Sequence, residues 1–190
     1  MNDVVRRLEE EGYYLPEPPK PVAAYVPGVL AGDLLFVSGQ LPFTGDTLLA
    51  TGKCPTDVTL DQAQEAAVQC LLNGLAVLNA EIGGDWDRLV RVVRLGVFVQ
   101  SADDFHQQPL VANGASEVCV EVFGERGRHA RAAVGVNALP LNAAVEVECV
   151  FQIRGAAPAA LSAEAATVVQ EPPSATTAAA SVPVAPPAAL

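Results

Sequence analysis

The sequence predicts an α+β domain whose helices pack on one face of a mixed sheet. Segments of strand composition alternate with two segments of helical periodicity, in the order β-β-α-β-α-β-β. The chain has 190 residues, 51% of them hydrophobic, which is enough for one globular domain with a substantial core. We place this domain at residues 21–154, between an N-terminal helix with a proline-rich arm at 1–20 and a tail at 155–190.

The two flanking segments differ from the domain in composition. Residues 1–20 favour a short helix that stops at Gly12 and continues as an extended, proline-rich arm. From 156 to 190 the chain holds 14 Ala and 6 Pro but no Lys, Arg or aromatic residue. Such a segment buries too little side-chain area to offset its loss of conformational entropy, so we expect a disordered tail.

The domain begins with two predicted strands. Residues 22–26 and 34–40 are rich in aliphatic, β-branched and aromatic side chains. Between them, Pro-Gly at 27–28 and Gly-Asp at 32–33 are turn signals. We therefore expect the two strands to pair with each other.

Two helices are expected in the middle of the domain. Apolar residues recur at helical spacing over 59–84, where Thr59 and Gln62 form a predicted capping box and a Gly-Gly pair ends the helix. A second helix is expected to begin at 101 or 103 and to end at 123. Pro109 is tolerated there only near the first turns.

Three further strands complete the predicted sheet, at 89–100, 130–138 and 143–154. The first is apolar on both faces and therefore needs cover on both sides. Its alternate residues divide into Val93, Leu95, Val97 and Val99 on one face, and Val90, Val92 and Phe98 on the other. The last strand alternates between an apolar face with Val145, Val147, Cys149, Phe151 and Ile153, and a mixed face with Glu146, Glu148, Val150 and Gln152.

One face of this sheet has no predicted helix to cover it. We expect it to carry apolar residues together with Arg131, Glu146 and Glu148. No element of the domain remains to bury those apolar side chains, and large exposed apolar faces are typical of interfaces. We therefore predict an oligomer in which these faces pack together, with clefts between the subunits.

Composition and charge disfavour several kinds of function. The formal net charge is -11, with 22 Asp and Glu against 11 Lys and Arg, whereas nucleic-acid binding normally uses a basic face. The four cysteines form no CxxC pair, and no Cys/His cluster has metal-ligand spacing, so we expect free thiols and no metal. Because we find neither a secretory signal nor a membrane-spanning apolar run, we expect a cytoplasmic protein.

Arg131 is the residue that most directly suggests a binding site. It precedes an apolar run in "RHARAAVGVNALP", where a half-buried guanidinium needs an anionic partner. By pattern alone the favoured partner is Glu146 or Glu148, in an ordinary cross-strand ion pair. A nucleic-acid phosphate or a small acidic substrate is the alternative. For His129, two residues earlier, the pattern favours a loop residue that precedes the strand.

Three segments of the domain resemble the RidA (YjgF) family of imine/enamine deaminases: "AAYVPGVLAGDLLFVSGQLP", "AEIGGDWDRLVRVVRLGVFVQSADDF" and "HARAAVGVNALPLNAAVEVE". The similarity spans residues 21–154 in the same element order. The family fold is similar to that of the small trimeric chorismate mutases, with three sheets forming a barrel and ligand clefts between subunits. The resemblance therefore implies a homotrimer.

The resemblance also implies a site and a reaction. Reactive 2-enamino and 2-imino acids, such as 2-aminoacrylate, would be hydrolysed to 2-oxo acids and ammonia without a cofactor. Arg131 would hold the substrate carboxylate through a two-pronged salt bridge, and Glu146 would position or activate the water. The main-chain carbonyl of Ala133 would contact that water. Positions that line the family's cleft fall on Tyr25, Ser38 and Asn113.

Two other functions are compatible with the same residues. One is a non-catalytic trimer that binds small carboxylates and serves a regulatory role. The other is the endoribonuclease activity attributed to some relatives, which the net charge of -11 disfavours.

Overall fold

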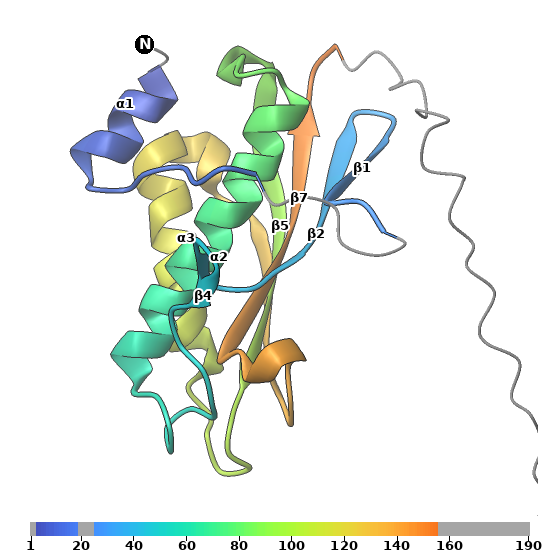
Figure 1. The fold of residues 1–190 in the computed structure, drawn as a ribbon. Coiled ribbons are helices and arrows are strands. Elements are labelled where there is room, and N and C mark those ends of the chain that lie inside the picture. Colours follow the sequence, from blue (N-terminus) through green and yellow to red (C-terminus); the bar gives the residue numbers. More distant parts are fainter. Residues whose placement is uncertain (1–2, 19–24, 156–190) are drawn as a thin grey trace, which may run out of the picture. The chain divides into compact units, whose positions relative to one another are not determined.

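The computed structural model describes residues 3–18 and 25–155. In this part of the chain, α2 and α3 cover one face of a five-stranded sheet, and α1 packs against α3 (Figure 1). The helices and strands are α1 (Asp3–Glu10), β1 (Gly28–Ala31), β2 (Leu34–Gln40), β3 (Phe43–Thr44), β4 (Thr47–Leu48), α2 (Leu60–Glu81), β5 (Leu89–Gln100), α3 (Gln108–Phe123), β6 (Ala130–Val136) and β7 (Val145–Ile153). Short 3-10 turns lie at η1 (Trp86–Arg88), η2 (Gly124–Gly127) and η3 (Pro140–Asn142).

The sheet has the strand order β1-β2-β7-β5-β6. Neighbouring strands are antiparallel except β5 and β6, which are parallel because α3 crosses over between them. The α+β class and the mixed sheet predicted from the sequence are confirmed. The predicted element order is also present, preceded by the expected N-terminal helix α1. One addition is the small hairpin of β3 and β4, which the sequence interpretation did not include.

The helix α2 begins and ends where the sequence signals indicate. The Thr59 hydroxyl accepts a hydrogen bond from the Gln62 N–H at 3.2 Å, and the Gln62 side chain accepts from the Thr59 N–H at 2.9 Å. After Ile82, Gly83 and Gly84 adopt φ of +64° and +76°, a conformation that ends the helix at little cost only for glycine. The predicted helix is confirmed, capping box included.

The helix α3 begins later than the sequence pattern indicated. It starts at Gln108, with Pro109 in its first turn, and not at 101 or 103. A proline has no N–H to donate and fits only the first turn of a helix, so its position fixes the helix start. Residues 102–107 therefore form a connection from β5, in which Phe105 is buried against the core.

The first predicted strand is in the wrong place. Its pairing partner β2 is at 34–40 as expected, but β1 occupies 28–31, and residues 25–26 are not in a strand. The cause is the tight turn formed by Gly32 and Asp33, which connects Ala31 to its strand partner Leu34. Gly32 has φ +64° in this turn. A two-residue turn fixes the register of a hairpin, so the partner strand must end immediately before it. The Pro-Gly pair at 27–28 thus begins the strand, and residues 22–24 lie outside the described residues.

Irregularities in β5 change which of its side chains face the helices. The register against β7 shifts between Leu89 and Arg91 and again between Val92 and Arg94. As a result Val92 is fully buried on the helix side, together with Leu95, and Val93 is only half-buried. The predicted grouping of Val93 with Leu95 is therefore wrong, because strict alternation does not continue through a bulge.

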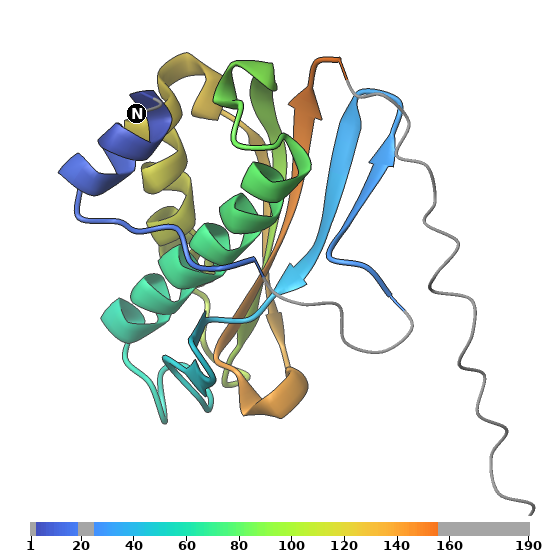
Figure 2. The same ribbon diagram turned by 45° about the horizontal axis from the view of Figure 1, so that its top comes forward.

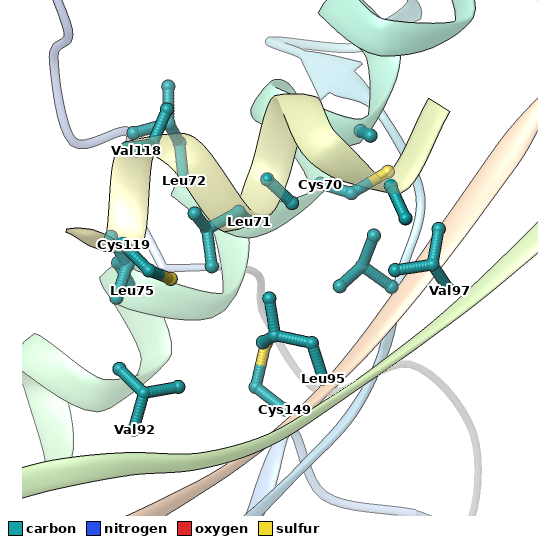
Figure 3. Packing of buried hydrophobic residues seen from close by; sticks show 14 of the residues in the cluster. Cys70, Leu71, Leu72, Leu75, Val92, Leu95, Val97, Val118, Cys119 and Cys149 are labelled. Atoms are coloured by element: carbon teal, nitrogen blue, oxygen red, sulfur yellow. The ribbon is translucent and has the colours of Figure 1, made fainter. Parts of the chain in front are cut away.

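The core lies between the helices and the sheet. Figure 3 shows side chains of α2 and α3 pointing toward side chains of β5 and β7. The labelled members are Cys70, Leu71, Leu72, Leu75, Val92, Leu95, Val97, Val118, Cys119 and Cys149. The alternation predicted for β7 is confirmed, since its odd-numbered residues are buried and its even-numbered residues are half-buried.

The opposite face of the sheet has no described helix over it (Figure 2). Phe36, Val29 and Val134 are exposed apolar side chains on these strands. Among the helices in the described residues, none combines the length and the apolar composition that a membrane span requires. The N-terminal helix α1 ends before Gly12, at φ +82°, but the division into arm, domain and tail stays a prediction because residues 156–190 lie outside the described residues.

Candidate functional site

The side chain of Arg131 points toward the helix layer. Arg131 is in β6, the edge strand, and its Nη1 donates to Asn113 Oδ1 at 3.0 Å and to Ser116 Oγ at 2.9 Å. Its Nη2 donates to the main-chain oxygen of Pro109 at 3.3 Å. All three acceptors belong to α3, and Asn113 and Ser116 are three residues apart, so their side chains lie on one face of that helix.

This orientation corrects the sequence-based placement of Arg131 on the open face of the sheet. Arg131 lies opposite Leu95, whose side chain is buried beneath the helices, whereas Glu146 lies opposite Phe98, on the other face. The strand β5 also separates β6 from β7, so Arg131 and Glu146 are not on neighbouring strands.

The ordinary cross-strand ion pair expected for Arg131 is absent from the described residues. Glu148 instead pairs with Arg94 on β5, with 2.5 Å between Oε1 and Nη1. The Glu148 carboxylate lies directly over Gly96. A Cβ at that glycine would be only 2.5 Å from Glu148 Oε1. Glu148 is therefore an ion-pair partner on the open face, as its pattern alone suggested, but its cation is Arg94.

The hydrogen bonds of Arg131 leave one edge of its guanidinium unoccupied by described residues. A guanidinium has five N–H donors. Both protons of Nη1 and one of Nη2 have acceptors on α3, which leaves the Nε–H and the second Nη2 proton. Nε and Nη2 form one side of the planar group, and such an edge can bind a carboxylate through two parallel hydrogen bonds.

His129 and Ser116 extend the hydrogen bonds around Arg131. His129 Nε2 is 3.1 Å from Ser116 Oγ, and His129 Nδ1 is 2.6 Å from the main-chain oxygen of Gly127. Burial lowers the pKa of His129, and the nearby charge of Arg131 lowers it further, against a raising effect of the Gly127 carbonyl. The sequence interpretation assigned no role to either residue. The available signal was the two-residue spacing of His129 and Arg131, which places both on one face of an extended segment.

Glu146 is half-buried on the open face of the sheet, above Gly39 of β2. Its carboxylate fills the space that a side chain at Gly39 would need, so the two strands approach closely only because residue 39 is glycine. Burial raises the pKa of Glu146, and the negative charge of Glu148 raises it further. A carboxyl group with a raised pKa is a stronger base and exchanges protons closer to neutral pH.

The remaining predicted site residues are Ala133, Ser38 and Tyr25. Ala133 is two residues after Arg131 on β6 and faces the helix side with it. Ser38 follows the buried Val37 on β2, and its hydroxyl donates to the main-chain oxygen of Val26 at 2.8 Å. Tyr25 precedes β1 and is 58% exposed. One copy of the chain thus brings Arg131 into contact with Asn113, with Ala133 on the same side of β6, whereas Glu146 lies on the opposite face of the sheet.

A separate hollow of about 260 Å³ lies where Tyr13 approaches α2 and α3. Its lining includes the carboxylates of Asp61, Glu65, Glu117 and Glu121. That charge disfavours an anionic substrate, so the predicted chemistry does not belong there. The described residues include no group of three or more His, Cys, Asp or Glu placed to hold a metal ion.

The five-stranded mixed sheet with two helices over one face defines a class of small α+β proteins. Within it, the chain matches the family described as Endoribonuclease L-PSP over residues 16–153. The chain belongs to this family, which is also called the RidA (YjgF) family, and the resemblance stated from the sequence is confirmed.

Individual relatives align over most of their length. Protein TCP17 of Trypanosoma cruzi is 44% identical over 151 residues, covering 79% of this chain and 94% of that protein. A 2-iminobutanoate/2-iminopropanoate deaminase of Dermatophagoides farinae is 27% identical over 138 residues, covering 73% of this chain and 92% of that protein.

Solved structures share the fold. The crystal structure of Atu1372 from Agrobacterium tumefaciens, described as a protein of unknown function, superposes with a TM-score of 0.76 at 44% identity and covers 80% of this chain and 92% of that one. The crystal structure of E. coli TdcF with bound serine gives a TM-score of 0.50 at 25% identity, covering 73% of this chain and 94% of that one.

Proposed function

We propose that this protein hydrolyses reactive 2-imino and 2-enamino acids to 2-oxo acids and ammonia. The observation that carries the proposal is the hydrogen bonding of the Arg131 guanidinium. Three of its N–H donors bind acceptors on α3, and its Nε–Nη2 edge has two donors without an acceptor among the described residues. A preorganised guanidinium edge suits a substrate carboxylate. A relative named as a 2-iminobutanoate/2-iminopropanoate deaminase supports the reaction class, and the serine-bound structure of TdcF supports a small amino-acid-like ligand.

The reaction requires proton transfers and one water. In 2-aminoacrylate, a proton moves from nitrogen to the methylene carbon and gives 2-iminopropanoate. The water oxygen then bonds to C2, the C=N bond becomes a single bond, and nitrogen takes up a proton. The hydroxyl proton of this carbinolamine then moves to nitrogen, the C–N bond breaks as the C=O bond forms, and ammonia leaves pyruvate behind. No electrons are exchanged with another molecule, so the balance needs no redox partner.

Each residue has a role that follows from its chemistry. Arg131 binds the carboxylate and so fixes C2 relative to the water. Glu146, with its raised pKa, takes a proton from the water and returns one to the leaving nitrogen. Ser38 keeps hydroxyl lone pairs after donating to Val26, so it can accept a hydrogen bond from the water or from the imine N–H. The carbonyl of Ala133 is a further acceptor for the water.

The proposal needs a second copy of the chain, because Arg131 and Glu146 face opposite sides of the sheet. The open face, with Phe36 and Val134 exposed, is the surface that we propose packs against other copies. We propose a homotrimer in which the Glu146 face of one subunit lies against the Arg131 edge of the next. Light scattering after size exclusion should give three times the 19.7 kDa chain mass. A monomer at micromolar concentration would contradict this arrangement.

The experiment for the activity measures 2-oxo acid release from imines made in situ by an amino-acid oxidase. Arg131→Ala should lower kcat/KM by about a hundredfold, since a charge-assisted, two-bond contact is lost. Arg131→Lys should recover only part of the rate, because an ammonium group lacks the planar fork. Arg128→Ala is the matched control, because Arg128 is exposed and pairs with Glu125. Wild-type rates in Arg131→Ala would rule out the proposed role.

A second candidate is binding of small carboxylates without turnover. The same Arg131 edge favours it, since holding a carboxylate requires none of the Glu146 chemistry. In that case 2-oxobutyrate would raise the thermal unfolding temperature, and imine hydrolysis would proceed at the uncatalysed rate. An endoribonuclease, the activity in the family's description, is disfavoured by 22 acidic against 11 basic residues.

A further inference from the structure

Ser116 joins Arg131 to His129 through one hydroxyl group. Ser116 Oγ is 2.9 Å from Arg131 Nη1 and 3.1 Å from His129 Nε2. The other ring nitrogen of His129 is 2.6 Å from the oxygen of Gly127. The three side chains come from α3, from β6 and from the segment that joins η2 to β6, so the contacts link the helix to the edge of the sheet.

The chemistry of the end groups fixes the direction of every hydrogen bond. The Gly127 carbonyl can only accept, so His129 Nδ1 carries a proton. In a neutral imidazole the other nitrogen is then bare, and Nε2 must accept from the Ser116 hydroxyl. Ser116 therefore presents only lone pairs to Arg131, which can only donate. Burial and Arg131 both lower the pKa of His129, which favours this neutral ring.

We infer that Ser116 and His129 are positioning residues for Arg131, which hold its guanidinium against α3 with the Nε–Nη2 edge directed to the substrate carboxylate. This inference rests on the proposed function. An arginine on an exposed edge strand has many side-chain conformations, and ordering it on binding would weaken the complex. The Ser116 hydroxyl, held toward β6 by His129, reduces that loss before the substrate arrives.

The expected effect is on binding more than on chemistry. Arg131 contacts the carboxylate equally in the ground state and in the transition state, so loss of its positioning should raise KM and leave kcat nearly unchanged. Because one neutral hydrogen bond to a charged partner is removed, we expect KM to rise about tenfold. A general loss of folded protein would instead lower the active concentration and leave KM as it was.

The test uses two matched pairs of variants in the full chain. Ser116→Val and Ser116→Thr have the same shape, and only the threonine keeps a hydroxyl. His129→Phe removes the acceptor, whereas His129→Gln can offer an amide oxygen near the position of Nε2. His106→Gln is the control, because the chain's other histidine is exposed and precedes α3. Thermal unfolding by circular dichroism checks that each variant is folded.

Two measurements separate this inference from the proposed function. The first is KM and kcat for the imine, and the second is the Kd of 2-oxobutyrate by calorimetry, which needs no turnover. We expect Ser116→Val and His129→Phe to raise both constants about tenfold, and Ser116→Thr and His129→Gln to stay close to wild type. In ¹⁵N-histidine NMR spectra, wild-type His129 should be the Nδ1-protonated tautomer.

Each outcome decides one of the two statements. If Ser116→Val and His129→Phe keep wild-type KM and Kd, the positioning role is overturned while the hydrolase function stands. Equal losses in Ser116→Thr and Ser116→Val would also overturn it, because the hydroxyl would not matter. If the wild type binds 2-oxobutyrate but does not turn over imines, the proposed function fails and the Kd series decides the positioning role. No binding and no turnover would overturn both.

Discussion

The amide oxygen of Asn113 lies 3.0 Å from Nη1 of Arg131 and thereby ties helix α3 to the edge strand β6. The helix that carries Asn113 also packs very closely against α2. A Cβ at the next residue, Gly114, would be only 2.5 Å from the main-chain oxygen of Gln64, so only glycine fits there. The orientation of the guanidinium thus depends on how closely two helices pack. A residue outside the sheet thus helps to decide which edge of the Arg131 guanidinium the described residues leave unoccupied.

We predict that the chemistry of residue 113 controls competition for Arg131. Asn113→Ala removes one acceptor and should raise KM up to about tenfold. Asn113→Asp places a carboxylate against the guanidinium, so that it competes with the substrate carboxylate, and should raise KM more, by about a hundredfold. Asn79→Asp, the same change of charge on the half-buried α2 position, is the control. Steady-state kinetics measure all three, and equal KM values for the alanine and aspartate variants would contradict competition.

A second prediction concerns pH and Glu146. The proposed base works in its ionised form, so kcat should fall as the pH falls through the pKa of Glu146. Burial and the charge of Glu148 both raise that pKa, so the acid limb should lie above the ordinary glutamate range. Glu148→Gln removes one of the two causes and should move the limb to lower pH. Glu146→Gln should lower kcat by about a hundredfold and remove the limb.

The pH–rate profile of these two variants gives a clear contradiction if the assignment is wrong. The two residues are on the same strand and the same face, two positions apart, so they are well matched. Loss of kcat and of the acid limb in Glu148→Gln, together with a normal Glu146→Gln, would assign the base to Glu148.

Much of the fold follows from local signals in the sequence. The capping box at Thr59 and Gln62 and the glycines after Ile82 gave the limits of α2, because caps act within one turn of the helix. The position of β1 depends on whether the hairpin turn is Pro-Gly at 27–28 or Gly-Asp at 32–33. Local residue preferences allow a turn at either place, so they do not decide between them. The bulges in β5 depend on pairing with β7, a long-range contact that periodicity within one strand does not reveal.

The site was predicted less completely, for a reason of topology. The residues Arg131 and Glu146 were named from a family resemblance, but their faces depend on strand order, and β5 lies between their two strands. Two spacings in the sequence point to the residues around Arg131. Asn113 and Ser116 are at helical spacing, and His129 and Arg131 are at strand spacing. The sequence alone does not state that these two pairs meet, since that requires α3 to cross over β6.

The third prediction concerns the four cysteines, all of which are free and buried. Burial raises the pKa of Cys119 to about 12, and it raises those of Cys70 and Cys149 well above the ordinary value. Since the thiolate is the reactive form, the folded protein should react very slowly with a disulfide reagent at pH 8. All four thiols should react once the protein is unfolded in guanidinium chloride. Rapid modification of the native protein would show that the core opens readily.

The last prediction links the open face of the sheet to activity. Phe36 is 46% exposed on that face, and Val120 is 40% exposed on α3, so the two sites are matched in exposure but lie on different layers. An aspartate at an interface leaves a charge without compensation, so Phe36→Asp should dissociate the proposed trimer and abolish imine hydrolysis together. Val120→Asp should keep both the oligomer mass and kcat. Light scattering and kinetics on the same samples test this, and an active Phe36→Asp monomer would show that one chain supplies the whole site.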